Sequence, residues 1–398
     1  MLSTVLTVAS LFVVGTYSSK YLFSLSSSVN KLMKETILGS VPVPRLAFSQ
    51  DRSFDGSPRV SIAFPDGYTD TMVLSRYYSN ENDRLARTEN CHFFGHLEGE
   101  PDACIALTGC PGSDDLELTI MSEHSTNPTF KWKKDGEVEL IESPFLGGKA
   151  RSEKVRKLDG EWTVEGDDEL VNPTIKNAEM ELAKNDNSKS VQSTNLLTLK
   201  FGYGDGFLGK TGSHANAKAY IQATLPHMQT LYCHSASLGT KIQLEISEIK
   251  HFSGKNFKAT VAMAESLETS TASEVGTADL VAYMGYDTET SGIVGIAAVS
   301  SVCMASAYNG QKFSINEWQA THAAAGQLVA HEVGHNLGMY HDFDNRHSGK
   351  GCDKTGVMSY GGLYTKWSTC SKSDFAAHVA YVAQMGQTWS ACMPSKFS

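Results

Sequence analysis

A run of twelve residues in the C-terminal part of the chain, HEVGHNLGMYHD, combines histidine and glutamate at helical spacing; it begins at His331 and ends at Asp342. A separation of four residues places His331 and His335 on one face of a helix, about one turn apart, so that both imidazoles can reach the same metal ion. Glu332 follows the first histidine and would lie beside the ion, where it can take a proton from bound water. The spacing therefore predicts a metal site with a base next to it.

Gly338 accounts for a third metal ligand. A glycine after the second histidine can adopt a positive φ, end the helix and turn the chain sharply. That turn would bring His341 back to the ion from outside the helix. Three neutral imidazoles leave a fourth position for water, which is typical of catalytic rather than structural zinc, and the ion lowers the pKa of that water towards about 7. We expect one catalytic Zn²⁺ held by His331, His335 and His341, with Glu332 as the catalytic base.

Two other interpretations of the three histidines are weaker. A helix with solvated histidines, or with histidines satisfied in the core, would not need the correctly spaced Gly338 and His341. A closed structural zinc site would need a fourth protein ligand and would have no use for Glu332.

The elements that must position this motif alternate between strand and helix patterns. The segment 318–330, directly upstream, is rich in Ala, Gln and Leu, which favour a helix. Alternating strands and helices in one block indicate an α/β domain. The expected order is a strand over 195–203, a helix over 213–237, a strand over 241–249, a helix over 258–270, strands over 278–283 and 292–299, and a helical run from about Ser314.

The N-terminal half shows a different pattern, with short alternating segments separated by Gly, Pro, Asn and Asp. Such spacing predicts a mainly β domain. The polar stretch 172–194 that follows is typical of a linker. The expected strands lie over residues 60–64, 71–75, 116–121, 129–133 and 137–141.

The first residues of the chain contain an apolar run from Val5 to Val14 that closes on small residues. Its length suits the core of a secretory signal peptide and is too short for a membrane span. No Lys or Arg precedes it, and the alternative is a buried helix or strand at the start of the fold. We expect a signal peptide over residues 1–18 and a secreted, extracellular protein, in which disulfides are permitted.

The composition describes an ordinary globular protein of 398 residues, with 41% hydrophobic and 20% charged side chains. The net charge of −10 argues against nucleic acid or an anionic membrane as the main partner, and no membrane span is expected. From Ser193 onwards the chain carries 14 basic and 15 acidic residues, against 20 and 29 before it. The C-terminal part is therefore near neutral, so its specificity should depend on cleft shape rather than on charge steering.

On these residues the chain resembles the adamalysin/reprolysin family of metzincins, whose marker is the form His-Asn-Leu-Gly-Met-x-His-Asp, here 335–342. The resemblance covers roughly 195–394 and, more weakly, 91–101, which is similar to a reprolysin propeptide segment. It implies an α/β metzincin catalytic domain, with a twisted mixed sheet of five strands and a zinc-binding active-site helix, preceded by a mainly β prodomain. The expected division is a signal peptide over 1–18, a propeptide domain over 19–175, a linker over 176–194 and a metalloprotease domain over 195–398.

The same resemblance implies a secreted zinc endopeptidase, made as a zymogen and acting as a monomer on protein or peptide substrates, either venom-type or directed at the extracellular matrix. Two other functions stay open: a non-catalytic binding protein or toxin that retains the fold, and a zinc amidase or other non-peptide hydrolase. The intact Glu332 and the complete set of three histidines favour the endopeptidase.

Further site residues follow from the resemblance. Met358, about seventeen residues after the third histidine, looks like the Met-turn of metzincins, the hydrophobic floor beneath the metal. Asp342 would orient the site, and the strand over 292–299 would form an edge that pairs antiparallel with substrate. Tyr360 departs from the reprolysin pattern; as in astacins and serralysins, its hydroxyl is a candidate oxyanion stabiliser, and the alternative is an aromatic ring that packs in the domain wall.

The remaining expectations concern the disulfides and a structural calcium ion. The family suggests the disulfides Cys303–Cys392 and Cys352–Cys370, with Cys233 left odd. In the N-terminal part we expect Cys91–Cys110, which leaves Cys104 as an early latency switch, a partner for Cys233 or an inert thiol; a cysteine switch near the domain boundary is missing. A structural Ca²⁺ is not expected, because Leu199 and Gly276 align with the acidic ligands that many reprolysins use.

Overall fold

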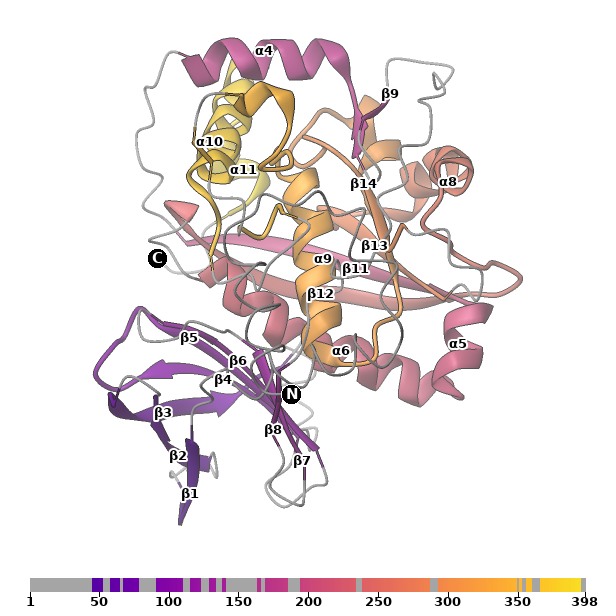
Figure 1. Ribbon diagram of the computed structural model, residues 1–398. Coiled ribbons are helices and arrows are strands. Elements are labelled where there is room, and N and C mark those ends of the chain that lie inside the picture. Colours follow the sequence, from indigo (N-terminus) through magenta and orange to yellow (C-terminus); the bar gives the residue numbers. More distant parts are fainter. Residues whose placement is uncertain are drawn as a thin grey trace, which may run out of the picture. The chain divides into compact units, whose positions relative to one another are not determined.

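The computed structural model describes two sheets with helices around the second (Figure 1). Within the described residues, no helix is both long and apolar enough to cross a bilayer. The described ranges are 45–52, 58–64, 67–78, 91–109, 115–122, 129–133, 138–140, 163–165, 169–184, 194–233, 238–286, 293–348, 351–352, 356–359 and 366–394. The predicted signal peptide lies outside them.

The first sheet is an eight-stranded antiparallel meander in which every strand pairs with its neighbours in sequence. Alternate residues such as Val60, Ile62, Met72 and Leu74 are buried in its core, as a period of two requires. The predicted alternating segments are confirmed as strands. The strands are β1 (Arg45–Arg52), β2 (Pro58–Ala63), β3 (Thr69–Arg76), β4 (His92–Leu97), β5 (Cys104–Thr108), β6 (Asp115–Met121), β7 (Thr129–Lys133) and β8 (Val138–Leu140).

The second sheet is mixed and has the strand order β12-β11-β13-β15-β14-β10-β9. Strands β11, β12, β13 and β15 are parallel, and β14 is antiparallel to β15. All of β13 is buried, as expected for a parallel strand covered on both faces. The mixed α/β class is confirmed. The strands are β9 (Thr163–Glu165), β10 (Glu169–Val171), β11 (Thr194–Gly204), β12 (Lys241–Phe252), β13 (Leu280–Gly285), β14 (Gly295–Ala298) and β15 (Phe313–Glu317).

The helices of this part include α9, which carries the histidine motif, and α6, which packs beside it (Figure 1). The two helices approach closely at Gly326, where a Cβ atom would lie 2.7 Å from the Cβ of His227 on α6. The helices are α4 (Pro173–Lys184), α5 (Asp205–Thr211), α6 (His214–Cys233), α8 (Val261–Glu274), α9 (His322–Asn336), α10 (Thr369–Gln384) and α11 (Trp389–Cys392), with short 3₁₀ turns at Ser306–Gln311 and Asn345–His347.

The helical run expected from about Ser314 is wrong at its start. Residues Phe313–Glu317 form strand β15, in which Phe313 and Ile315 are fully buried. The helix begins only at His322, because Thr321 caps it by accepting a hydrogen bond from the Ala324 N–H.

The segment expected to be a linker contains helix α4. Asn172 caps it by accepting hydrogen bonds from the N–H groups of Thr174 and Ile175, and Pro173 occupies the first helical position, where proline is favoured. Ile175 and Glu179, four residues apart, are both buried. The charged composition of this stretch concealed an amphipathic helix that packs against α10.

Strand β14 is not an edge strand in this chain, contrary to the expectation for 292–299. One side of it pairs antiparallel with β15, and the other side pairs parallel with β10, where Glu169 lies opposite Ala297 and Leu170 opposite Ala298. The expectation was wrong because β10, which lies far away in the sequence, pairs with β14, and the residue types of β14 do not indicate this partner.

Candidate metal centre

Helix α9 ends in a left-handed turn at Gly338, whose φ is +92°. The Gly338 N–H donates to the His335 carbonyl at 2.8 Å, and the Met339 N–H donates to the Gly334 carbonyl at 3.0 Å. This is the Schellman pattern, which closes the helix and reverses the chain. A Cβ at Gly338 would also lie 2.8 Å from Cγ of His378, so both conformation and space require glycine.

The turn brings three buried imidazoles together. His331, His335 and His341 are each at most 2% exposed, and one ring nitrogen from each lies within 4.8 Å of the others. The Nε2 atoms of His331 and His341 are 3.2 Å apart. Two nitrogens bound to one tetrahedral Zn²⁺ at 2.0–2.1 Å are separated by about 3.4 Å. The spacing therefore fits a zinc ion.

The hydrogen bonds of the Nδ1 atoms determine the tautomers of His331 and His335. His331 Nδ1 lies 2.7 Å from the Val357 carbonyl oxygen, and His335 Nδ1 lies 2.8 Å from that of Met339. A carbonyl oxygen only accepts, so each Nδ1 carries the proton and each Nε2 keeps its lone pair for a metal. The donor chemistry of the cluster thus suits zinc.

Glu332 is completely buried and lies against strand β14. A Cβ atom at Gly295, the first residue of β14, would lie 2.8 Å from Cγ of Glu332 and closer still to its carboxylate. The carboxylate therefore occupies space that only a glycine leaves open. This contact places the candidate base beside the backbone of a strand.

Asp342 links the loop of the third histidine to the segment that contains Met358. Its N–H donates to the Met358 carbonyl at 3.0 Å, and its carboxylate accepts from the hydroxyls of Ser359 at 2.7 Å, Ser371 at 3.2 Å and Ser368. Burial raises the pKa of Asp342, while the serine hydrogen bonds act in the opposite direction. The carboxylate ties three segments together behind the histidines.

Met358 is fully buried beneath α9. A Cβ at Gly334 would lie 2.8 Å from its sulfur and 3.1 Å from the ring of Trp367, so the helix rests directly on these two side chains. Trp367 is held in turn by a hydrogen bond from its Nε1 to the Leu231 carbonyl of α6.

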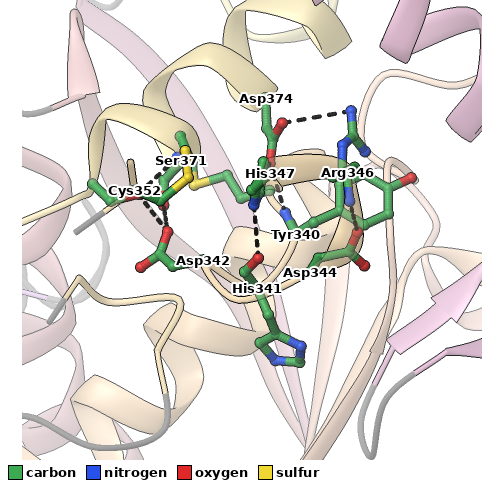
Figure 2. A network of polar contacts seen from close by, with 12 residues as sticks. Tyr340, His341, Asp342, Asp344, Arg346, His347, Cys352, Ser371 and Asp374 are labelled. Atoms are coloured by element: carbon green, nitrogen blue, oxygen red, sulfur yellow. Dashed lines mark hydrogen bonds and ion pairs between the residues drawn. A yellow bond between two sulfur atoms is a disulfide. The ribbon is translucent and has the colours of Figure 1, made fainter. Parts of the chain in front are cut away.

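A second polar network behind His341 was not anticipated from the sequence (Figure 2). His347 contacts the His341 carbonyl through Nδ1 at 2.9 Å and the Asp374 carboxylate of α10 through Nε2 at 3.0 Å. Burial lowers the pKa of His347, but the hydrogen bond to Asp374 and its charge outweigh burial and raise the pKa overall. Asp374 also accepts from the Tyr340 N–H at 3.1 Å and lies 3.5 Å from the Arg346 guanidinium.

This network holds the backbone on both sides of the His341 side chain, through the Tyr340 N–H before it and the His341 carbonyl after it. The sequence shows only a histidine six residues after His341, and its partner Asp374 lies 27 residues further on, so local spacing does not connect the two.

The cysteines form disulfides wherever the structure describes them. The structure contains the disulfides Cys303–Cys392 and Cys352–Cys370, the pairings that the resemblance implies, and a third between Cys104 and Cys233. Cys104 is therefore neither a free thiol nor a zinc ligand here. His347 lies close to Cys352 and Cys370, but the disulfide removes both sulfurs as metal ligands. Cys91 is disulfide-bonded, and its expected partner Cys110, like Tyr360, lies outside the described residues.

Comparison with known proteins connects this geometry to a family. Residues 193–380 match the family model Reprolysin_5, described as metallo-peptidase family M12. A Caenorhabditis elegans protein named "A disintegrin and metalloproteinase with thrombospondin motifs adt-1" is 32% identical over 108 residues, which is 27% of this chain and 7% of that protein. A solved structure titled "Structure of a chaperone-substrate complex" aligns with 48% of this chain and 35% of its own, at 19% identity and a TM-score of 0.34, a likeness too distant to interpret.

Proposed function

Residues 193–380 belong to metallo-peptidase family M12, and we propose that the chain is a secreted, zinc-dependent endopeptidase made in a latent form. The observation that carries this proposal is the convergence of three buried imidazoles, two with Nε2 prepared for a metal, next to the buried carboxylate of Glu332. His331, His335 and His341 would hold the ion. The disulfides Cys104–Cys233, Cys303–Cys392 and Cys352–Cys370 are consistent with the oxidising environment outside the cell.

A bound Zn²⁺ would lower the pKa of a water molecule and polarise the substrate carbonyl. The chain itself moves the proton: the Glu332 carboxylate accepts it from the attacking water and passes it to the amide nitrogen that leaves. The hydrogen bonds from His331 and His335 to backbone carbonyls keep both rings oriented throughout. Met358 and Trp367 support the helix that carries all of these groups except His341.

Strand β14 supports a peptide as the substrate. A substrate chain that pairs with this strand gains main-chain hydrogen bonds regardless of its side chains. Because the Glu332 carboxylate lies against Gly295, the first residue of β14, a peptide on this strand would pass next to the base. This arrangement favours an endopeptidase over an amidase that acts on small molecules.

The pairing of β10 with β14 supports latency. The strand Glu169–Val171 uses the same side of β14 that a substrate would use, so both cannot bind at once. Strand β10 runs parallel to β14, whereas the family resemblance leads us to expect that a substrate peptide runs antiparallel to it. We therefore assign β10 an inhibitory role and expect activation to require its departure.

Tyr360 is proposed as a further donor to the oxyanion. If it acts through its hydroxyl, Tyr360→Phe should lower kcat/KM with little change in zinc content. An unchanged kcat/KM would exclude the hydroxyl as an oxyanion donor, and Tyr360 would then be an aromatic ring that packs in the domain wall.

The function is tested with purified protein freed of β10 by limited proteolysis. Casein cleavage is expected, together with one zinc per chain, and a chelator should abolish it reversibly. Glu332→Ala should lose cleavage while keeping zinc, and His335→Ala should lose both. His96→Asn on β4 serves as the matched histidine control. A zinc-loaded, activated sample that cleaves no peptide would contradict the proposal and favour a binding protein that retains the fold.

A further inference from the structure

The eight-stranded sheet is joined covalently to the domain that carries the metal centre. Cys104 in β5 forms a disulfide with Cys233, the last residue of α6, across 129 positions of sequence. A cut in the backbone between these two cysteines leaves the pieces on either side attached. The polar sequence 185–193 and the segment 141–162 both lie between them.

Buried hydrogen bonds reinforce this attachment. His227 on α6 is 1% exposed and lies between two threonine hydroxyls of the sheet, with Nε2 at 2.8 Å from Thr108 Oγ1 and Nδ1 at 2.7 Å from Thr119 Oγ1. Burial lowers the pKa of His227 to about 3, so the ring is neutral and can donate to one hydroxyl while it accepts from the other. Separating the two parts would expose groups that are now paired.

The sheet also contacts the start of the helix that bears the metal ligands. Glu117 in β6 accepts a hydrogen bond from the Ala323 N–H at 2.9 Å and lies 3.3 Å from Nδ1 of His322. The first N–H groups of a helix have no partner within the helix, and a carboxylate at this end is favourable for the helix dipole. One turn further, the Gln327 side chain donates to the Thr129 hydroxyl at 2.9 Å. His331 follows after one more turn.

From these contacts we propose that the sheet β1–β8 is a permanent part of the working protease, kept in place by Cys104–Cys233 and supporting helix α9 through Glu117. The inference rests on the proposed function and specifies how it is regulated. The part that leaves on activation is the short segment with β10 and α4, which requires cuts on both sides of it, in 141–162 and in 185–193. The sheet itself stays.

The attachment is tested on the full chain carrying recognition sequences for a site-specific protease in 141–162 and 185–193. After both cuts, a denaturing gel without reductant should show the sheet and the metal-binding fragment as one band, and reductant should separate them. The double variant Cys104→Ser, Cys233→Ser should give two bands in both conditions. Separate bands from the wild-type chain without reductant would overturn the proposal. This result does not depend on any cleavage of substrate.

The support of α9 is tested separately with Glu117 variants that keep the disulfide. Glu117→Ala should lower kcat at least fivefold with KM and zinc content unchanged, and should speed hydrogen exchange in peptides that cover 318–330. Glu117→Gln retains an oxygen acceptor for the Ala323 N–H and should recover most of the loss. Glu98→Ala, which changes an exposed glutamate directly after strand β4, is the control.

If Glu117→Ala exchanges hydrogen over 318–330 at the same rate as the wild-type chain, the supporting role of Glu117 is wrong. Full activity of the double cysteine variant after removal of its sheet fragment would also overturn the proposal. If the wild-type enzyme cleaves no substrate, the proposed function fails, yet the gel and the hydrogen exchange still decide this inference.

Discussion

The carboxylate of Glu332 lies directly against the backbone of Gly295, so close that a Cβ at this position would lie 2.8 Å from Cγ of the glutamate. The first residue of β14 thus determines where the candidate base can lie. The two residues lie 37 positions apart in the sequence, one on strand β14 and the other on helix α9.

Gly295→Ala should therefore displace the base and not the metal. A misplacement of about 1 Å at a reacting group costs on the order of 10²-fold in rate. We expect kcat to fall by about that factor while zinc content stays at one per chain. Gly209→Ala is the matched control, because no atom lies within 4 Å of its Cβ position. Wild-type kcat in Gly295→Ala would show that Glu332 tolerates another position.

Asp374→Asn should loosen the third histidine. The buried His347 loses its charged partner, and with it the hydrogen bonds that hold the backbone beside His341. Zinc affinity should fall on the order of tenfold, as for other partners of metal ligands. Competition with a chromophoric chelator measures this change. His251→Gln, a histidine paired with Asp205 in another part of the domain, should retain wild-type affinity.

Leu170→Pro should activate the uncut chain. Strand β10 is paired on both sides, with β14 and β9, so a residue that lacks an N–H cannot replace Leu170 without losing a ladder bond. We expect at least a tenfold increase in peptide cleavage before any proteolytic processing. Leu170→Ala keeps the backbone donor and is the control. Equal activity of the two variants would argue against strand pairing as the basis of latency.

Asp279→Asn should stabilise the domain above pH 6. Burial raises the pKa of Asp279 from 3.8 to about 6, and its carboxylate accepts from the Thr198 N–H at 2.7 Å. The folded state therefore holds a proton that the unfolded state releases, so stability declines as pH rises from about 4 to 6. Asparagine keeps the acceptor and removes the charge.

Chemical denaturation at a series of pH values measures this effect. The gain at pH 7 should not exceed about 3 kcal/mol, from 1.36 kcal/mol per pKa unit. The decline between pH 4 and 6 should be reduced in the variant. An identical pH profile for both proteins would show that the folded Asp279 ionises normally.

The local part of the candidate site could be predicted from the sequence. The spacing of His331 and His335 follows from the 3.6-residue turn of a helix. A residue with a positive φ at the end of a helix is usually a glycine, which indicates the role of Gly338. The alternating strands of the first sheet and most elements after residue 194 also follow from local periodicity. These features depend on residues within a few positions of each other, so residue types record them directly.

Only the tertiary structure decided the long-range relationships. Backbone pairing between β10 and β14 uses N–H and C=O groups that every non-proline residue carries, so no residue type in either strand marks the other as its partner. Glu117 and Glu179 look like ordinary surface charges in the sequence, yet Glu117 contacts the start of α9 and Glu179 is buried against His378 at 2.9 Å. Their roles depend on which distant surfaces meet. The three histidines of the candidate metal site could therefore be predicted from the sequence. The groups that pack around these histidines, and those that connect the first sheet to helices α6 and α9, are determined by tertiary packing.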